Sequence, residues 1–164
     1  ILKTATCSSM SGRSKLTYQV GCSGDSEILF RISDNSGTGF FSQEWVPLAA
    51  IHQAFAKAPS AKSITSFHLH PLFQGKSINT PAFLLAALKN EGVVVPSTTI
   101  RRCQELTDGA KFQGEMRALM EGKPSKTGGG GMPDVTKGGA PKAKAGDRPK
   151  PAATPKGKGS TKKR

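Results

Sequence analysis

Two adjacent arginines, Arg101 and Arg102, are the side chains of this sequence best suited to an anionic ligand. They follow three hydroxyl side chains, Ser97, Thr98 and Thr99, within the run "EGVVVPSTTIRRCQEL". Hydroxyl and guanidinium groups both donate hydrogen bonds to phosphates and base edges, so this spacing favours a surface that binds nucleic acid. A core helix that exposes two arginines to solvent accounts for the same run, and both interpretations stay open.

The cations of the C-terminal part are the second feature that suits nucleic acid. Residues 122–164 hold 12 Lys and Arg against 2 Asp and Glu, a net charge of +10, whereas residues 1–121 hold 12 against 9, a net charge of +3. Dispersed cations displace condensed counterions from phosphates whatever the base sequence. The candidates for phosphate contact are Lys142, Lys144, Arg148, Lys150, Lys156, Lys158, Lys162, Lys163 and Arg164. A solubilising segment or a basic localisation signal is the alternative.

Two other motifs suggest chemistry that their spacing does not support. The run "HPLFQGKS" ends like a phosphate-binding loop, but His70 stands where that loop needs its first glycine, and "INTP" separates it from the next helix. Only Lys76 is retained from it, as a candidate for contact with a backbone phosphate. His68 and His70 share a face at strand spacing, yet no set of four paired ligands for zinc is visible. We therefore expect no metal, no cofactor and no small-molecule substrate.

The period of the apolar residues predicts the elements that position these side chains. Alternation in "LTYQV" and "ILFRIS" predicts two antiparallel strands, over 16–20 and 28–33, and puts Tyr18 and Phe30 on one buried face. Further strands are expected over 39–41 and 63–70. A helical period follows, and helices are expected over 42–57, 80–92, 96–106 and 111–120. Strands first and helices after indicate an α+β arrangement.

The segment 81–106 resembles the helix-turn-helix of winged-helix and helix-turn-helix repressors. Ala86 and Ala87 would allow two helices to approach closely, Gly92 would make the turn, and "STTIRR" would open the second helix. The resemblance implies that this second helix lies in the major groove of DNA, with Arg101 and Arg102 facing outwards. The turn "GVVVPS" departs from the pattern because it is long and apolar, and its three valines suit a short strand equally well.

Two weaker resemblances also point to nucleic acid. Lysines spaced by Pro, Ala and Gly resemble the tails of linker histones and of some bacterial DNA-binding proteins, which implies phosphate contact without base specificity. The run "GFFSQEWVPLAAI" is weakly similar to the coactivator-type single-stranded DNA-binding fold. That likeness implies unpaired bases on Tyr18, Phe30 and Arg31. Alternation favours a core position for Tyr18 and Phe30 instead.

The sequence thus predicts an α+β domain over 1–121 and a disordered basic tail over 122–164. The domain is expected to hold a small antiparallel sheet of three to four strands and then helices that include a helix-turn-helix-like pair. No apolar run is long enough to cross a bilayer, which favours a cytoplasmic, nucleoid-associated protein. The expected function is non-enzymatic DNA binding, as an accessory or nucleoid-type factor of a bacterium, phage or mobile element. RNA binding, a protein-interaction or assembly module with a solubilising tail, and a homodimer stay open.

Overall fold

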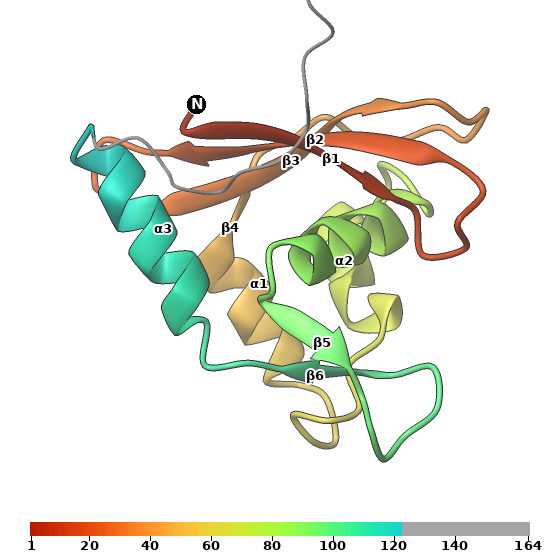
Figure 1. The fold of residues 1–164 in the computed structure, drawn as a ribbon. Coiled ribbons are helices and arrows are strands. Elements are labelled where there is room, and N and C mark those ends of the chain that lie inside the picture. Colours follow the sequence, from red (N-terminus) through yellow and green to blue (C-terminus); the bar gives the residue numbers. More distant parts are fainter. Residues whose placement is uncertain (123–164) are drawn as a thin grey trace, which may run out of the picture. The chain divides into compact units, whose positions relative to one another are not determined.

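The computed structural model describes residues 1–122 of the 164-residue chain, so the predicted basic tail lies outside the described residues. The described part is an α+β fold with an antiparallel sheet and four helices, as predicted (Figure 1). The elements in chain order are β1 (Lys3–Ser8), β2 (Lys15–Cys22), β3 (Ile28–Asn35), β4 (Val46–Pro47), α1 (Leu48–Phe55), the 3-10 helix η1 (Ser66–Phe73), α2 (Thr80–Asn90), β5 (Val94–Pro96), β6 (Gln104–Leu106) and α3 (Ala110–Met120).

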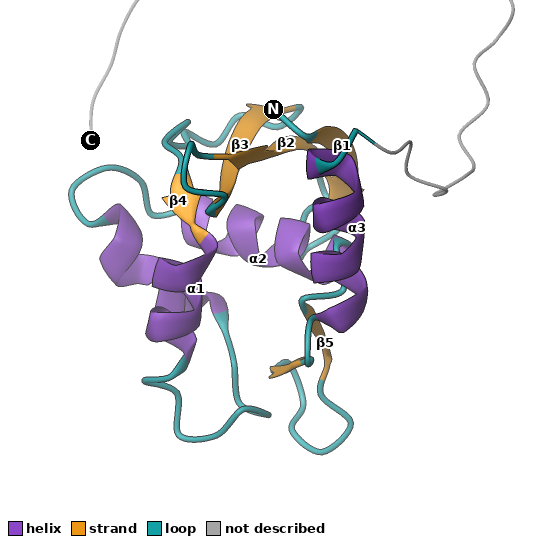
Figure 2. Cartoon of the chain, turned by 90° about the vertical axis from the view of Figure 1, so that its left-hand side faces the viewer, coloured by secondary structure: helices purple, strands orange, loops and turns teal. Residues whose placement is uncertain are grey.

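The strands β1 to β4 form one antiparallel sheet in chain order, with its apolar face towards the helices. Tyr18 pairs with Ile32 and Val20 pairs with Phe30 across β2 and β3, and all four side chains are fully or almost fully buried. Figures 1 and 2 show the described helices on this side of the sheet. The alternation of "LTYQV" and "ILFRIS" therefore identified both central strands and the face that they bury.

Helix α2 begins and ends close to the predicted residues. Pro81 occupies its first turn, where its missing N–H costs no hydrogen bond. Gly92 follows the helix with a φ of 72°, in the left-handed region that favours glycine, and Val93 N–H then donates to the Leu88 carbonyl at 2.9 Å. The chain turns away from α2 at this point and enters β5.

Two predicted strands are wrong, and one predicted helix begins later than expected. Residues 39–41 form no strand, and the fourth strand of the sheet is β4. Helix α1 begins at Leu48, after Pro47, because proline is tolerated only before or within the first turn. The predicted strand over 63–70 is largely the helix η1, and Ile64 alone forms an isolated bridge to Gln104.

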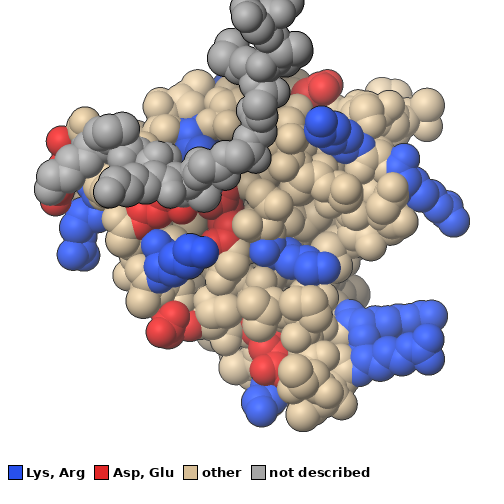
Figure 3. Space-filling model, viewed as in Figure 1, with Lys and Arg blue, Asp and Glu red and all other residues tan. Residues whose placement is uncertain are grey.

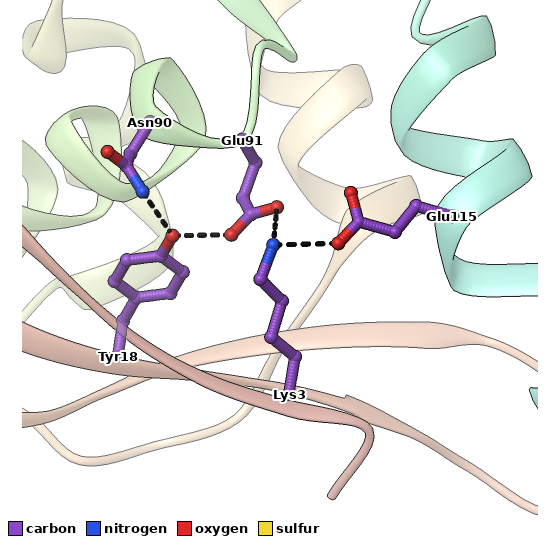
Figure 4. A network of polar contacts seen from close by, with 5 residues as sticks. All are labelled: Lys3, Tyr18, Asn90, Glu91 and Glu115. Atoms are coloured by element: carbon purple, nitrogen blue, oxygen red, sulfur yellow. Dashed lines mark hydrogen bonds and ion pairs between the residues drawn. The ribbon is translucent and has the colours of Figure 1, made fainter. Parts of the chain in front are cut away.

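A buried polar network joins the sheet to the helices (Figure 4). Glu91 follows α2, and its carboxylate accepts a short hydrogen bond from the Tyr18 hydroxyl. The same carboxylate forms an ion pair with Lys3 Nζ at 2.9 Å. Lys3 Nζ also lies 2.9 Å from a carboxylate oxygen of Glu115 on α3, and Asn90 Nδ2 donates to Tyr18 Oη at 2.7 Å. The Glu91 side chain is only 2% exposed. Residues of β1, β2, α2 and α3 thus share one set of charge-assisted hydrogen bonds.

This network makes the fold sensitive to alkaline pH. Burial and the hydrogen bond to Glu91 raise the pKa of Tyr18, the only tyrosine. Burial lowers the pKa of Lys3, but its hydrogen bonds to Glu91 and Glu115 outweigh that effect and raise it. The unfolded chain releases these protons near pH 10, whereas the folded chain retains them. The contribution of these two groups to the free energy of unfolding should therefore be constant below about pH 9. It should fall as the pH rises above about 10.

Urea unfolding between pH 7 and 11 measures this dependence. Tyr18→Phe removes one of the two titrating groups, so its alkaline loss of stability should be shallower than that of the wild-type chain. An identical loss in both chains would show that Tyr18 makes no contribution.

Candidate nucleic-acid interface

The predicted residues of "STTIRR" lie in the loop of a β-hairpin and not on a helix. Strands β5 and β6 pair antiparallel, with Val94 opposite Leu106 and Pro96 opposite Gln104. The helix predicted over 96–106 is therefore wrong, and the predicted helix-turn-helix pair lacks its second helix. The structure nevertheless brings five predicted site residues together in this loop: Ser97, Thr98, Thr99, Arg101 and Arg102.

The apolar run before the loop explains why this segment is extended. β-branched side chains favour strands, and Val93 and Val94 are 2% and 0% exposed. The backbone groups of Gln104 in β6 have partners on both sides. Gln104 pairs with Pro96 of β5, and it exchanges backbone hydrogen bonds of 2.7 and 3.0 Å with Ile64. Ile64 lies far from Gln104 in the sequence, so a tertiary contact supports the hairpin.

Side chains at the base of the loop hold its shape. Ser97 Oγ donates to the Glu105 carboxylate at 2.7 Å and accepts hydrogen bonds from the backbone N–H groups of Thr99 and Ile100. The Thr98 N–H donates to the same carboxylate at 3.0 Å. These hydrogen bonds, the one from Ser97 first, lower the pKa of Glu105. The loop therefore has an ordered start, fixed by one serine and one carboxylate.

The far side of the loop presents its two arginines to solvent. Ser97 N–H donates to the Cys103 carbonyl at 2.9 Å and closes the loop, and Arg102 reaches this turn with a φ of 65°. A positive φ is uncommon for a residue with a side chain. Arg101 and Arg102 are both exposed, and among residues 1–122 neither takes part in an ion pair. Basic side chains gather at the end of the hairpin (Figure 3).

The other predicted site residues lie elsewhere or outside the described part. Lys76 belongs to the connection between η1 and α2, where its ammonium group is 2.5 Å from a carboxylate oxygen of Glu44. The structure does not place it in the hairpin. The nine predicted cations between Lys142 and Arg164 lie outside the described residues.

The three residues of the alternative site on the sheet lie on opposite faces of that sheet. Tyr18 and Phe30 are 0% exposed, and Phe30 stacks on Phe112 of α3 with ring centroids 5.5 Å apart, so both belong to the core. Arg31 lies on the opposite face, with its guanidinium carbon 4.6 Å from the centre of a Trp45 ring.

The packing of Trp45 on the sheet was not predicted. Its ring lies against Gly21, where an added Cβ would be 3.0 Å from ring atoms, so a larger residue at this position would displace the ring. Arg31 Nε donates a hydrogen bond to Gln19 Oε1 at 2.7 Å, which fixes the arginine over the sheet. Sequence reasoning missed this arrangement because it placed Trp45 on a helix.

The described histidines do not form a metal site. His68 Nδ1 accepts a hydrogen bond from the Thr65 N–H at 3.1 Å, which caps η1. Within residues 1–122 no three His, Cys, Asp or Glu side chains are grouped so as to hold a metal ion. None of the helices described in this range is long and apolar enough to cross a membrane.

Comparison of the chain with protein-family models, with curated proteins and with solved structures finds no match.

Proposed function

We propose that this chain is a non-enzymatic DNA-binding protein, an accessory or nucleoid-type factor of a bacterium, phage or mobile element. In this proposal the β5–β6 hairpin contacts a groove, and the cations of 122–164 contact phosphates. The observation that carries it is the pair of exposed arginines, free of ion pairs within the described residues, at the end of a braced hairpin. The whole chain has a net charge of +13, which favours an anionic partner.

A hairpin can take the place of the predicted recognition helix. The major groove of B-DNA is about 12 Å wide and admits a two-stranded β-ribbon as well as a helix. Arginine suits two targets, a guanine edge in the groove and a phosphate of the backbone. Its guanidinium binds either of them through two parallel hydrogen bonds. The bonds from Ser97 and Thr98 to Glu105 order the loop before binding, which reduces the entropy lost on complex formation.

The two basic regions would have different roles. Dispersed cations bind phosphates without regard to sequence and speed up association, whereas base preference requires side chains at fixed positions. Residues 122–164 supply most of the charge, and the ordered loop supplies fixed donors. We therefore assign general affinity to the first region, and register on the duplex to the second.

The double variant Arg101→Ala/Arg102→Ala tests the hairpin. Its affinity for duplex DNA near physiological salt should fall about 10- to 100-fold, and the slope of log affinity against log salt should become shallower by about 2. Fluorescence anisotropy with labelled duplex DNA measures both quantities. The matched control, Arg13→Ala/Arg117→Ala, removes the same charge from exposed positions of the β1–β2 loop and α3.

Equal losses in the two double variants would mean that only net charge matters and that the hairpin is not an interface. Tighter binding of hairpin RNA than of duplex DNA of equal length would replace DNA by RNA as the ligand. Partner binding that survives deletion of 123–164, without affinity for either nucleic acid, would favour an assembly module instead.

A further inference from the structure

The surface beside η1 exposes aromatic side chains that the proposed function does not use. The three most exposed large apolar side chains among residues 1–122 are Phe40, Ile78 and Phe67, at 91%, 81% and 74%. Phe40 and Ile78 belong to neighbouring segments, because Ser77 Oγ and Asn79 Nδ2 both donate to the Phe40 carbonyl, at 3.1 and 2.9 Å. Exposed apolar side chains that gather in this way mark interaction sites.

The segment of Ile78 and the helix η1 border a hollow of about 660 Å³, whose walls include Phe67, His70, Pro71, Lys76 and Ile78. We call it the aromatic hollow. The rings of Phe67 and His70 lie 5.8 Å apart at an angle of 35°. The hollow therefore combines open ring faces with an ammonium group at its edge.

The backbone around the hollow is held in place, so Phe67 is presented and not merely loose. Leu69 and Phe73 of the same helix are 0% and 3% exposed and anchor η1 in the core. Thr65 and His68 cap its first turn with reciprocal hydrogen bonds. Phe67 lies on the other side of η1, where its exposed ring adds little to the stability of the fold.

We infer that the aromatic hollow binds an unpaired nucleotide of a single-stranded nucleic acid, an inference that rests on the proposed function. A base stacks on the rings of Phe67 and His70, and the adjoining phosphate pairs with Lys76. Each base stacked on an aromatic side chain contributes enough affinity to matter alone, and every base has a face that can stack. The net charge of +13 favours an anionic strand over a basic or neutral protein partner.

The Glu44 carboxylate competes with the phosphate of this ligand for Lys76. Its carboxylate holds Lys76 at 2.5 Å, but both side chains are about half exposed, at 50% and 49%. Such surface pairs contribute little to stability, so a phosphate can displace the carboxylate. Glu44→Gln should therefore raise the affinity for single strands about two- to fivefold, whereas Lys76→Ala should lower it.

The full chain with a single-stranded oligonucleotide that carries 2-aminopurine tests the inference. Stacking quenches this fluorescent base, and anisotropy gives the affinity in the same titration. Phe67→Leu keeps an apolar side chain but removes the ring, so it should abolish the quenching and lower single-strand affinity about five- to hundredfold. Phe67→Tyr should retain both. Met10→Ala, at another exposed apolar position, is the control.

Duplex DNA in parallel titrations separates this inference from the proposed function. Phe67→Leu should leave duplex affinity unchanged, because the hairpin arginines and the cations of 122–164 are intact. Unchanged quenching and single-strand affinity in Phe67→Leu would overturn the inference, whatever the duplex result, and would leave an apolar protein segment as the occupant. Loss of duplex binding in Arg101→Ala/Arg102→Ala tests the proposed function alone.

Discussion

Removal of residues 123–164 is expected to lower the affinity for duplex DNA about a hundredfold or more near physiological salt. The deletion takes away 12 Lys and Arg and only 2 Asp and Glu, which is most of the net charge of +13. If about eight of these cations contact phosphates, the log affinity of the full chain falls against log salt with a slope near −7. The truncated chain retains the hairpin arginines, so its slope should lie near −2.

Anisotropy titrations over a range of salt concentrations measure both slopes. A chain of full length with the lysines of 123–164 changed to glutamine is the matched control. It should behave like the truncated chain, because charge and not length carries the expected effect. A slope near zero for the full chain would contradict phosphate binding altogether.

Glu91→Ala is expected to destabilise the fold by about 3–5 kcal/mol. The carboxylate is 2% exposed and accepts both the Tyr18 hydroxyl and the Lys3 ammonium. Its removal leaves two donors in the interior with too few acceptors, and one of them is charged. Lys3 retains only Glu115 on the other side of the network.

Urea unfolding at neutral pH measures this loss. Glu44→Ala is the matched control, because it also breaks a lysine–glutamate pair, but one in which both partners are half exposed. It should change the free energy of unfolding by about 1 kcal/mol or less. Equal effects of the two substitutions would show that burial of the network adds nothing to its strength.

The network also supports the candidate interface through the chain that follows it. Glu91 directly precedes Gly92 and Val93, which lead into β5. Thr107 follows β6, and its hydroxyl donates to the Gly92 carbonyl at 2.8 Å, while its N–H donates to Val93 at 3.1 Å. The base of the hairpin is thus fixed to the end of α2. Glu91→Ala should be compared with the hairpin variant only under conditions in which both chains are folded.

Local patterns in the sequence determined the sheet and one helix. Alternation over 16–20 and 28–33 has only one explanation at strand length, because successive side chains of a strand point to opposite faces. It therefore predicted that Tyr18 and Phe30 are buried. Pro81 and Gly92 marked the limits of α2, since proline suits a first turn and glycine the left-handed residue after a helix. The uneven charge of the chain is likewise a property of the sequence alone.

Tertiary contacts decided the candidate site. Residues 96–106 suit a helix by their period and the valines before them suit a strand, and the bridge from Gln104 to the distant Ile64 supports the β5–β6 hairpin. The run "SITSFHLH" alternates like a strand, yet its residues from Ser66 onwards belong to η1, which buries Leu69 and Phe73. The hairpin arginines and the exposed ring of Phe67 owe their positions to these contacts. Burial of distant partners, and not local preference, set the surface that this protein presents.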